Sequence, residues 1–248
     1  MSPFRMTPAV KALLIANLAV YIVELLVANW LGHYEFVFRH FALSPSRVFN
    51  FPIPEIWQPL TYMWLHDHVM PSHLLMNMLA LWMFGGLLEM RWGSRSFVRF
   101  WVLCGVIGGL GFLVVASFIG WNTKIVGASG AVFGLLVAFG ILYKDLQVYL
   151  MFMIPMRGRT LVLLFVGIEL LTLLTRTETF SVVAHLSGAA GGWLLVTGYW
   201  RPSKIIARVR AAVPPPKPKP RKRADHLRVV PKDEDDEKGS NGAGKYLH

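Results

Sequence analysis

Cysteine and charge are both scarce in this chain of 248 residues. The single cysteine, Cys104, excludes an intrachain disulfide and any zinc site that needs two or more thiolates. Charged residues make up only 16% of the sequence, hydrophobic residues make up 54%, and the mean hydropathy is +0.48. A soluble domain of this length carries more charge and fewer unbroken apolar runs. The composition therefore predicts a protein that crosses a membrane several times.

Two common hydrolase motifs are also missing. The chain has no H-E-x-x-H sequence, and the loosely spaced His66, Asp67, His68 and His73 do not replace it, so we expect no metal and no other cofactor. The sequence around Ser129 is Gly-Ala-Ser-Gly-Ala, which differs from the G-x-S-x-G nucleophile elbow. Hydrolysis by a zincin or by an α/β-hydrolase is therefore not indicated.

Six apolar segments approach the roughly 20 residues that a membrane span requires. They cover residues 12–31, 73–90, 100–120, 126–143, 160–175 and 182–200. The segment 160–175 is short and contains Glu169, to which the sequence assigns no role, as with Glu24 in the first segment. We expect an all-α polytopic membrane protein, with six transmembrane helices within residues 12–200 after a cytoplasmic N-terminus, residues 1–11.

The lysines and arginines favour one orientation of these helices. Twelve flank the ends that face inward when both termini are cytoplasmic, and four flank the opposite ends. No transit peptide is recognisable at the N-terminus, and we expect an integral multi-pass protein of a bacterial inner membrane. In this topology the second, fourth and sixth helices all begin at the outer face.

Two stretches lie outside the predicted helices. Residues 32–72 are rich in aromatic side chains and predict an interfacial loop between the first and second helices. Residues 201–248 carry 13 Lys/Arg and 6 Asp/Glu, with a proline-rich block, and predict a disordered cytoplasmic tail. Its basic part predicts contact with anionic lipid of the bilayer, and we expect no nucleic-acid partner.

Four polar residues predict a catalytic site. Polar side chains are costly inside a membrane, yet His73, Asn77, Ser129 and His185 all lie in first turns of helices that begin at the outer face. A serine with a neutral imidazole as base suits acyl transfer, and Asn77, His73 and the Ser129 amide suit an oxyanion hole. No carboxylate is placed to orient His185, so we expect a Ser–His dyad.

Small residues in the fourth and sixth helices predict how these groups meet. Gly130 and Gly134 form one small-x-x-x-small stripe, and Ala184, Gly188 and Gly192 form another. Such stripes let two helix backbones approach closely. Taken alone, Ser129 would more often be a packing residue, and only its shared depth with the two histidines and Asn77 favours catalysis.

Three stretches together resemble the rhomboid intramembrane serine proteases. They are "HLLMNMLALWMFGGLLEMRWGS", "GASGAVFG" and "AHLSGAAGG", in this order. The resemblance implies Ser129 as nucleophile, His185 as base, and Asn77, His73 and the Ser129 amide as oxyanion-hole donors. It further implies structural roles for Glu89 and Arg91, an aromatic packed on the histidine at Phe133, and a gate and cap formed by the fifth helix and residues 176–183.

The expected function is therefore that of an intramembrane serine endopeptidase, which cleaves transmembrane segments of membrane proteins near the outer face. An inactive rhomboid-like protein that binds membrane clients is the first alternative, and members of that class usually lack the serine or the histidine. A small transporter is the second alternative, but the inverted repeat that it predicts is not seen.

Overall fold

The computed structural model describes residues 6–49, 52–150, 153–175, 179–199, 201 and 203. All of them belong to one compact unit, Met1–Ile206. The tail predicted at residues 201–248 lies outside the described residues, except for positions 201 and 203. Residues 176–178 of the predicted cap lie outside them as well.

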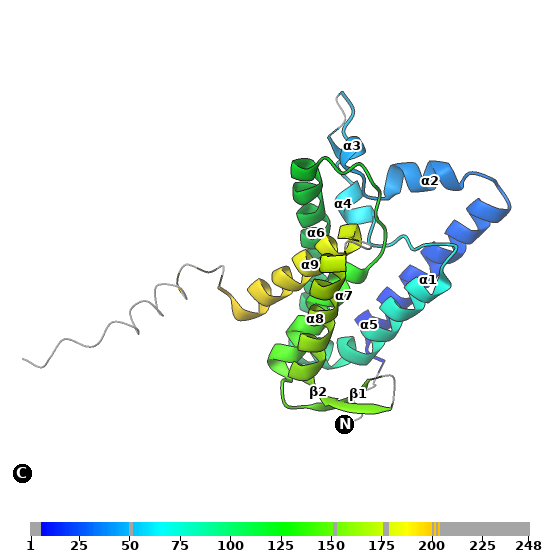
Figure 1. Cartoon of the computed structure of the whole chain (residues 1–248). Helices are drawn as coiled ribbons and strands as arrows, with labels where there is room; N and C mark the ends of the chain where they lie inside the picture. Colours follow the sequence, from blue (N-terminus) through cyan, green and yellow to red (C-terminus); the bar gives the residue numbers. More distant parts are fainter. Residues whose placement is uncertain are drawn as a thin grey trace, which may run out of the picture. The chain divides into compact units, whose positions relative to one another are not determined.

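Long helices dominate the described part of the chain (Figure 1). They are α1 (Pro8–Asn29), α5 (Pro71–Trp92), α6 (Ser94–Ile119), α7 (Ser129–Leu142), α8 (Gly158–Thr175) and α9 (Thr179–Thr197), and each matches one of the six predicted segments. Five of these helices are long and apolar enough to cross a membrane, the segment with Glu169 among them. At 14 residues α7 is too short for that criterion, with a length of about 21 Å. The prediction of a helical polytopic membrane protein is confirmed.

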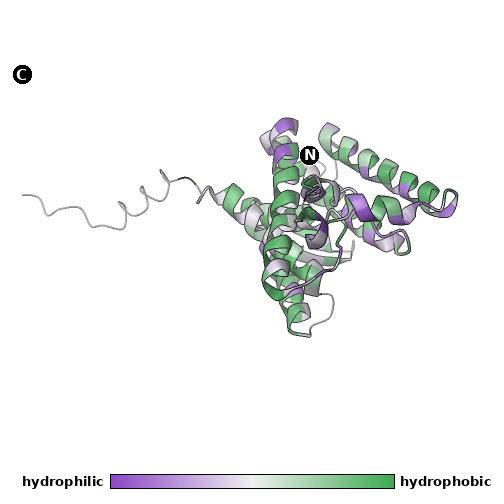
Figure 2. Ribbon diagram, turned by 90° about the horizontal axis from the view of Figure 1, so that it is seen from above, coloured by the Kyte–Doolittle hydropathy of each residue, from purple (hydrophilic) through white to green (hydrophobic). Residues whose placement is uncertain are grey.

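The short helix α7 lies at the centre of the bundle. Eleven of its 14 residues are buried, and it packs against α5, α6, α8 and α9. A helix that is hydrophobic on all sides is stable only when other elements cover it. The peripheral helices instead expose apolar side chains, such as Ile15 and Leu18 of α1 and Leu163 of α8. Figure 2 shows hydrophobic residues along much of the length of the helices. Exposed apolar side chains suit contact with lipid.

Shorter elements connect the long helices. The predicted interfacial segment contains α2 (Tyr34–Phe41), α3 (Pro45–Val48) and α4 (Gln58–Thr61). Between α7 and α8, the strands β1 (Gln147–Leu150) and β2 (Ile154–Arg157) pair antiparallel. The sequence does not predict this hairpin, because each of its strands is only four residues long. The end of the bundle at β1 and β2 is called the hairpin end, and the end where α7 begins is called the site end.

At the hairpin end, Glu89 of α5 makes hydrogen bonds to both α1 and α6. Its carboxylate accepts hydrogen bonds from the backbone N–H groups of Ala9, at 2.8 Å, and Val10, at 2.9 Å, and from Ser94 Oγ, at 2.6 Å. Backbone N–H groups in the first turn of a helix have no partner within the helix, so Glu89 satisfies two of them for α1. Arg91 is exposed and makes no ion pair with Glu89 in the described structure. Glu89 thus acts with α1 and α6, and a joint structural role with Arg91 stays a prediction.

The backbones of α7 and α9 touch at two glycine pairs. A Cβ atom added to Gly188 would lie 2.1 Å from the carbonyl oxygen of Gly130, and one added to Gly192 would lie 2.5 Å from that of Gly134. Real Cβ atoms do not approach a backbone oxygen so closely, and a backbone oxygen has no rotamer by which to move away. Only glycine therefore fits at these two positions of α9.

Gly188→Ala tests this contact, with Gly167→Ala in α8 as its matched control. We expect Gly188→Ala to destabilise the fold by at least about 1–3 kcal/mol, because α9 must move away from α7. Nothing lies within 4 Å of a Cβ added to Gly167, so its replacement should be neutral or slightly stabilising. Thermal unfolding in detergent, followed by tryptophan fluorescence, measures both. Equal midpoints for the two variants would contradict the close contact.

Candidate active site

The chain enters α7 through a loop that the 32–72 segment holds in place. Leu43 and Ile125 exchange two backbone hydrogen bonds of 3.0 Å, and the N–H of Gly127 donates to the carbonyl oxygen of Tyr62 at 2.9 Å. These contacts keep the residues before α7 out of the helix. They fix the position of Ser129, the first residue of α7.

The start of α7 suits the binding of a negative charge. No side chain caps this end of the helix, because the N-cap residue is Ala128. The N–H groups of a first turn lack intrahelical acceptors, and the helix dipole places partial positive charge there. The Ser129 hydroxyl therefore sits beside backbone donors that can stabilise an oxyanion.

The serine and the histidine meet as the sequence predicted from their shared depth. Ser129 Oγ lies 2.7 Å from Nε2 of His185 in α9. The ring of Phe133, four residues after Ser129, stacks on the imidazole with centroids 4.6 Å apart and an interplanar angle of 10°. The stacking holds the plane of the imidazole ring against α7.

His73 and Asn77 reach the same place from α5. Gly127 has a φ of +122°, and a Cβ added to it would lie 2.7 Å from His73 Nε2 and 3.7 Å from Ser129 Oγ. The absence of a side chain at Gly127 thus lets the His73 ring approach Ser129. Asn77 is buried, and its Nδ2 has no hydrogen-bond partner in the part of the chain that the structure describes. A buried donor without an acceptor is costly, so this amide is available to a bound oxyanion.

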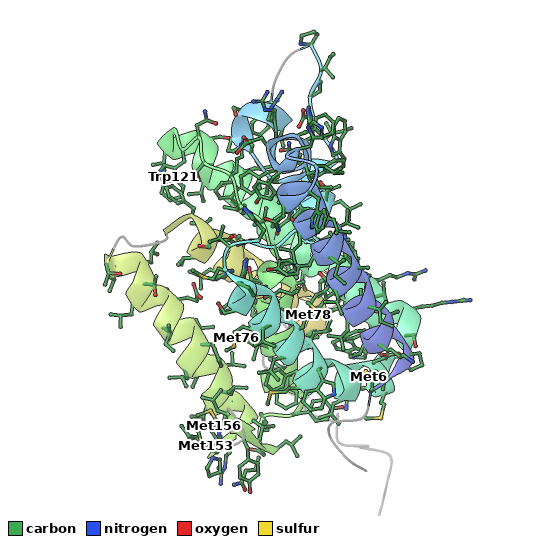
Figure 3. All side chains as sticks on the ribbon, turned by 90° about the vertical axis from the view of Figure 1, so that its right-hand side faces the viewer. Met6, Met76, Met78, Trp121, Met153 and Met156 are labelled. Atoms are coloured by element: carbon green, nitrogen blue, oxygen red, sulfur yellow. The ribbon has the colours of Figure 1, made fainter. Side chains whose placement is uncertain are left out.

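A cavity of about 360 Å³ joins these groups. Ser129, His185, His73 and Asn77 line it, together with apolar side chains from α5, α7 and α8: Met76, Ala80, Met83, Val132, Phe165 and Ile168. Figure 3 labels Met76 on α5, at the side of the bundle where α8 stands. The cavity is therefore mostly apolar, with its polar groups confined to one cluster.

Glu169 is the residue that the sequence analysis missed. Its Oε1 lies 3.0 Å from Nδ1 of His185, on the opposite side of the imidazole from Ser129. The expectation that no carboxylate lies near His185 was therefore wrong. Glu169 is surrounded by apolar residues along its helix, so the sequence does not show which face of α8 meets α9. The only signal was the presence of a carboxylate in a membrane helix.

A second polar cluster supports the wall of the cavity. The carboxylate of Glu24 in α1 accepts a hydrogen bond from the backbone N–H of His66 at 3.1 Å. The ring of His66 is fully buried, with its centroid 5.3 Å from that of His73. Burial, helped by the neighbouring His73, lowers the pKa of His66 to about 4, so this ring is neutral near pH 7. Glu24, to which the sequence assigned no role, thus anchors the segment beside His73.

The geometry agrees with comparisons to known proteins. A family model described as "Rhomboid domain" matches residues 54–202. The rhomboid protease GluP of Bacillus subtilis (strain 168) is 30% identical over 139 residues, which cover 56% of this chain and 25% of that protein. RHOMBOID-like protein 1 of Arabidopsis thaliana is 34% identical over 142 residues, covering 57% and 34%. The putative rhomboid protease YdcA of Bacillus subtilis (strain 168) is 29% identical over 141 residues, covering 57% and 66%.

The matched region spans a quarter to two thirds of the length of these relatives. The region matched by the family model contains α5 to α9 and every residue of the polar cluster around Ser129. Apolar helices long enough to cross a membrane lie in the same region. The chain is an integral, multi-pass membrane protein, and it belongs to the rhomboid family.

Proposed function

We propose that this chain is an intramembrane serine endopeptidase that works through Ser129 and His185. The observation that carries the proposal is the 2.7 Å contact between Ser129 Oγ and His185 Nε2, at a helix N-terminus inside a largely apolar cavity. A serine hydroxyl is a weak nucleophile until a base removes its proton, and this contact supplies the base. Relatives that are named as rhomboid proteases support the same reaction class.

The reaction begins when Ser129 Oγ attacks the carbonyl carbon of a substrate peptide bond. His185 Nε2 takes the hydroxyl proton as the new C–O bond forms, and the former carbonyl oxygen gains negative charge. Asn77 Nδ2, the His73 ring and the Ser129 amide N–H are the donors for that oxyanion. His185 then gives the proton to the leaving amine, and water releases the acyl group by the reverse path.

The substrates that we propose are transmembrane segments of other proteins, cut near the outer face of a bacterial inner membrane. The lysine and arginine distribution supports an arrangement with both termini in the cytoplasm, which places the site end outward. A peptide bond inside a helix is hydrogen-bonded and shielded, so the substrate must unwind locally before attack. Small or helix-breaking residues near the cleaved bond would ease that step.

An inactive rhomboid-like protein that only binds membrane clients is less well supported. Such a protein needs neither a nucleophile nor a base. Here both groups are present, in hydrogen-bond contact, and Asn77 Nδ2 in the same cavity has no hydrogen-bond partner within the described part of the chain. Three polar groups that each cost free energy inside a membrane are more readily explained by catalysis than by binding alone.

Cleavage of a transmembrane reporter tests the proposal. The wild-type chain, reconstituted in liposomes with the reporter, should release a fragment, and Ser129→Ala and His185→Ala should each reduce the rate at least about 10³-fold. Ser117→Ala is the matched control, because this hydroxyl bonds to the carbonyl of Leu113 in its own helix, α6. A folded wild-type protein that cleaves no reporter, or an active Ser129→Ala variant, would contradict the proposal.

Asn77→Ala tests the oxyanion hole separately. We expect kcat for the reporter to fall about 10²–10³-fold with little change in KM, because the amide helps the transition state more than the bound substrate. Asn17→Ala is the control, since Asn17 is also a buried amide of a membrane helix but donates to Leu13 within α1. An equal effect of the two substitutions, or a change in KM alone, would show that Asn77 is not an oxyanion donor.

A further inference from the structure

Glu169 is a carboxylate that the reaction above does not use. It belongs to α8, and its side chain is only 14% exposed. Its Oε1 lies 3.0 Å from His185 Nδ1, while His185 Nε2 lies 2.7 Å from Ser129 Oγ. Carboxylate, imidazole and hydroxyl therefore form a continuous row across three helices.

The two contacts of His185, with Glu169 and with Ser129, assign a role to each nitrogen of its imidazole ring. A neutral imidazole has one N–H donor and one acceptor nitrogen, whereas an ionised carboxylate only accepts. With Glu169 facing Nδ1, the proton of the ring belongs on Nδ1, and Nε2 is left to accept the Ser129 proton. We propose that Glu169 is the third member of a Ser–His–Glu triad, a positioning residue that fixes the tautomer and rotation of His185. This inference rests on the proposed protease function.

The negative charge of Glu169 also suits the reaction. When Nε2 takes the hydroxyl proton, His185 becomes an imidazolium in a cavity whose walls are mostly apolar. A cation without a partner is costly in such a place, and a carboxylate at 3.0 Å compensates it. No proton has to reach Glu169 at any step: the ring keeps its Nδ1 proton, and the Nε2 proton passes to the leaving amine.

The contact between Glu169 and His185 depends on how α8 packs against α9. In the described part of α8, the buried residues are Gly158 and Leu161, both at the hairpin end. Toward the site end, Phe165, Ile168 and Glu169 line the cavity, and the bond to His185 is a polar link from α8 to α9. Glu169 can therefore position the base only while α8 stays docked against α9.

Two substitutions at position 169 distinguish the effect of the negative charge from the effect of side-chain size. Glu169→Gln keeps the size of the side chain but loses the negative charge, and its amide can turn an N–H toward Nδ1. Glu169→Asp keeps the charge but shortens the side chain. If Glu169 orients and compensates His185, kcat for the transmembrane reporter should fall at least about tenfold in the Gln variant with unchanged KM, and less in the Asp variant.

A merely structural role predicts the opposite order, because Gln fills the same space and Asp leaves a void. The full-length chain in liposomes is the sample, thermal midpoints are recorded for each variant, and Thr172→Val in the same helix is the control. Thr172 is half-buried, and its hydroxyl donates to the carbonyl oxygen of Ile168. Activity of the Gln variant equal to wild type, or above that of the Asp variant, would overturn the triad. Absence of cleavage by wild type would instead overturn the protease proposal on which it rests.

Discussion

The direct contact between the backbones of α7 and α9 is the constraint on which the site depends. Gly188 lies against Gly130, and Gly192 lies against Gly134. Ser129 immediately precedes the first of these α7 glycines, and His185 is three residues before Gly188. A side chain at either contact would separate the helices and lengthen the 2.7 Å distance between hydroxyl and imidazole. Packing and chemistry are therefore specified by adjacent residues of the same two helices.

Polar groups in this bundle are tolerated because they are concentrated and mostly paired. The carboxylate of Glu89 satisfies the first turn of α1, and that of Glu24 holds the backbone of the segment before α5. The hydroxyl of Ser129 and both nitrogens of His185 have partners, whereas the Nδ2 of Asn77 has none among the residues that the structure describes. Each paired group avoids most of the cost of burial. The Asn77 amide lies where a developing oxyanion would need a donor.

The sequence predicted the helices well, and it singled out four polar residues that the structure brings to one cavity: His73, Asn77, Ser129 and His185. Membrane helices are long and apolar, so the few polar residues within them are easily recognised, and their position along each helix gives their depth. The fourth helix was predicted to begin near residue 126, but it begins at Ser129. The positive φ of Gly127 and the pairing of Leu43 with Ile125 keep the preceding residues out of the helix.

The direction in which a residue points from its helix axis is harder to predict than its depth in the membrane. Glu169 was recognised as a polar residue, but nothing in its apolar neighbours showed that it faces His185. In the same way, Ala9 and Val10, the partners of Glu89 in α1, lie 80 and 79 positions away in the sequence, so no local pattern could show this contact. Both contacts depend on how helices pack.

The most direct test of the account is the chemical reactivity of Ser129. A fluorophosphonate reacts with a serine only when a base activates the hydroxyl, and peptide mapping by mass spectrometry locates the adduct. We expect the wild-type chain to form one adduct, on Ser129. The His185→Ala variant should form no adduct there. No adduct on the folded wild-type protein, an adduct on another serine, or one on Ser129 that persists without His185 would contradict it.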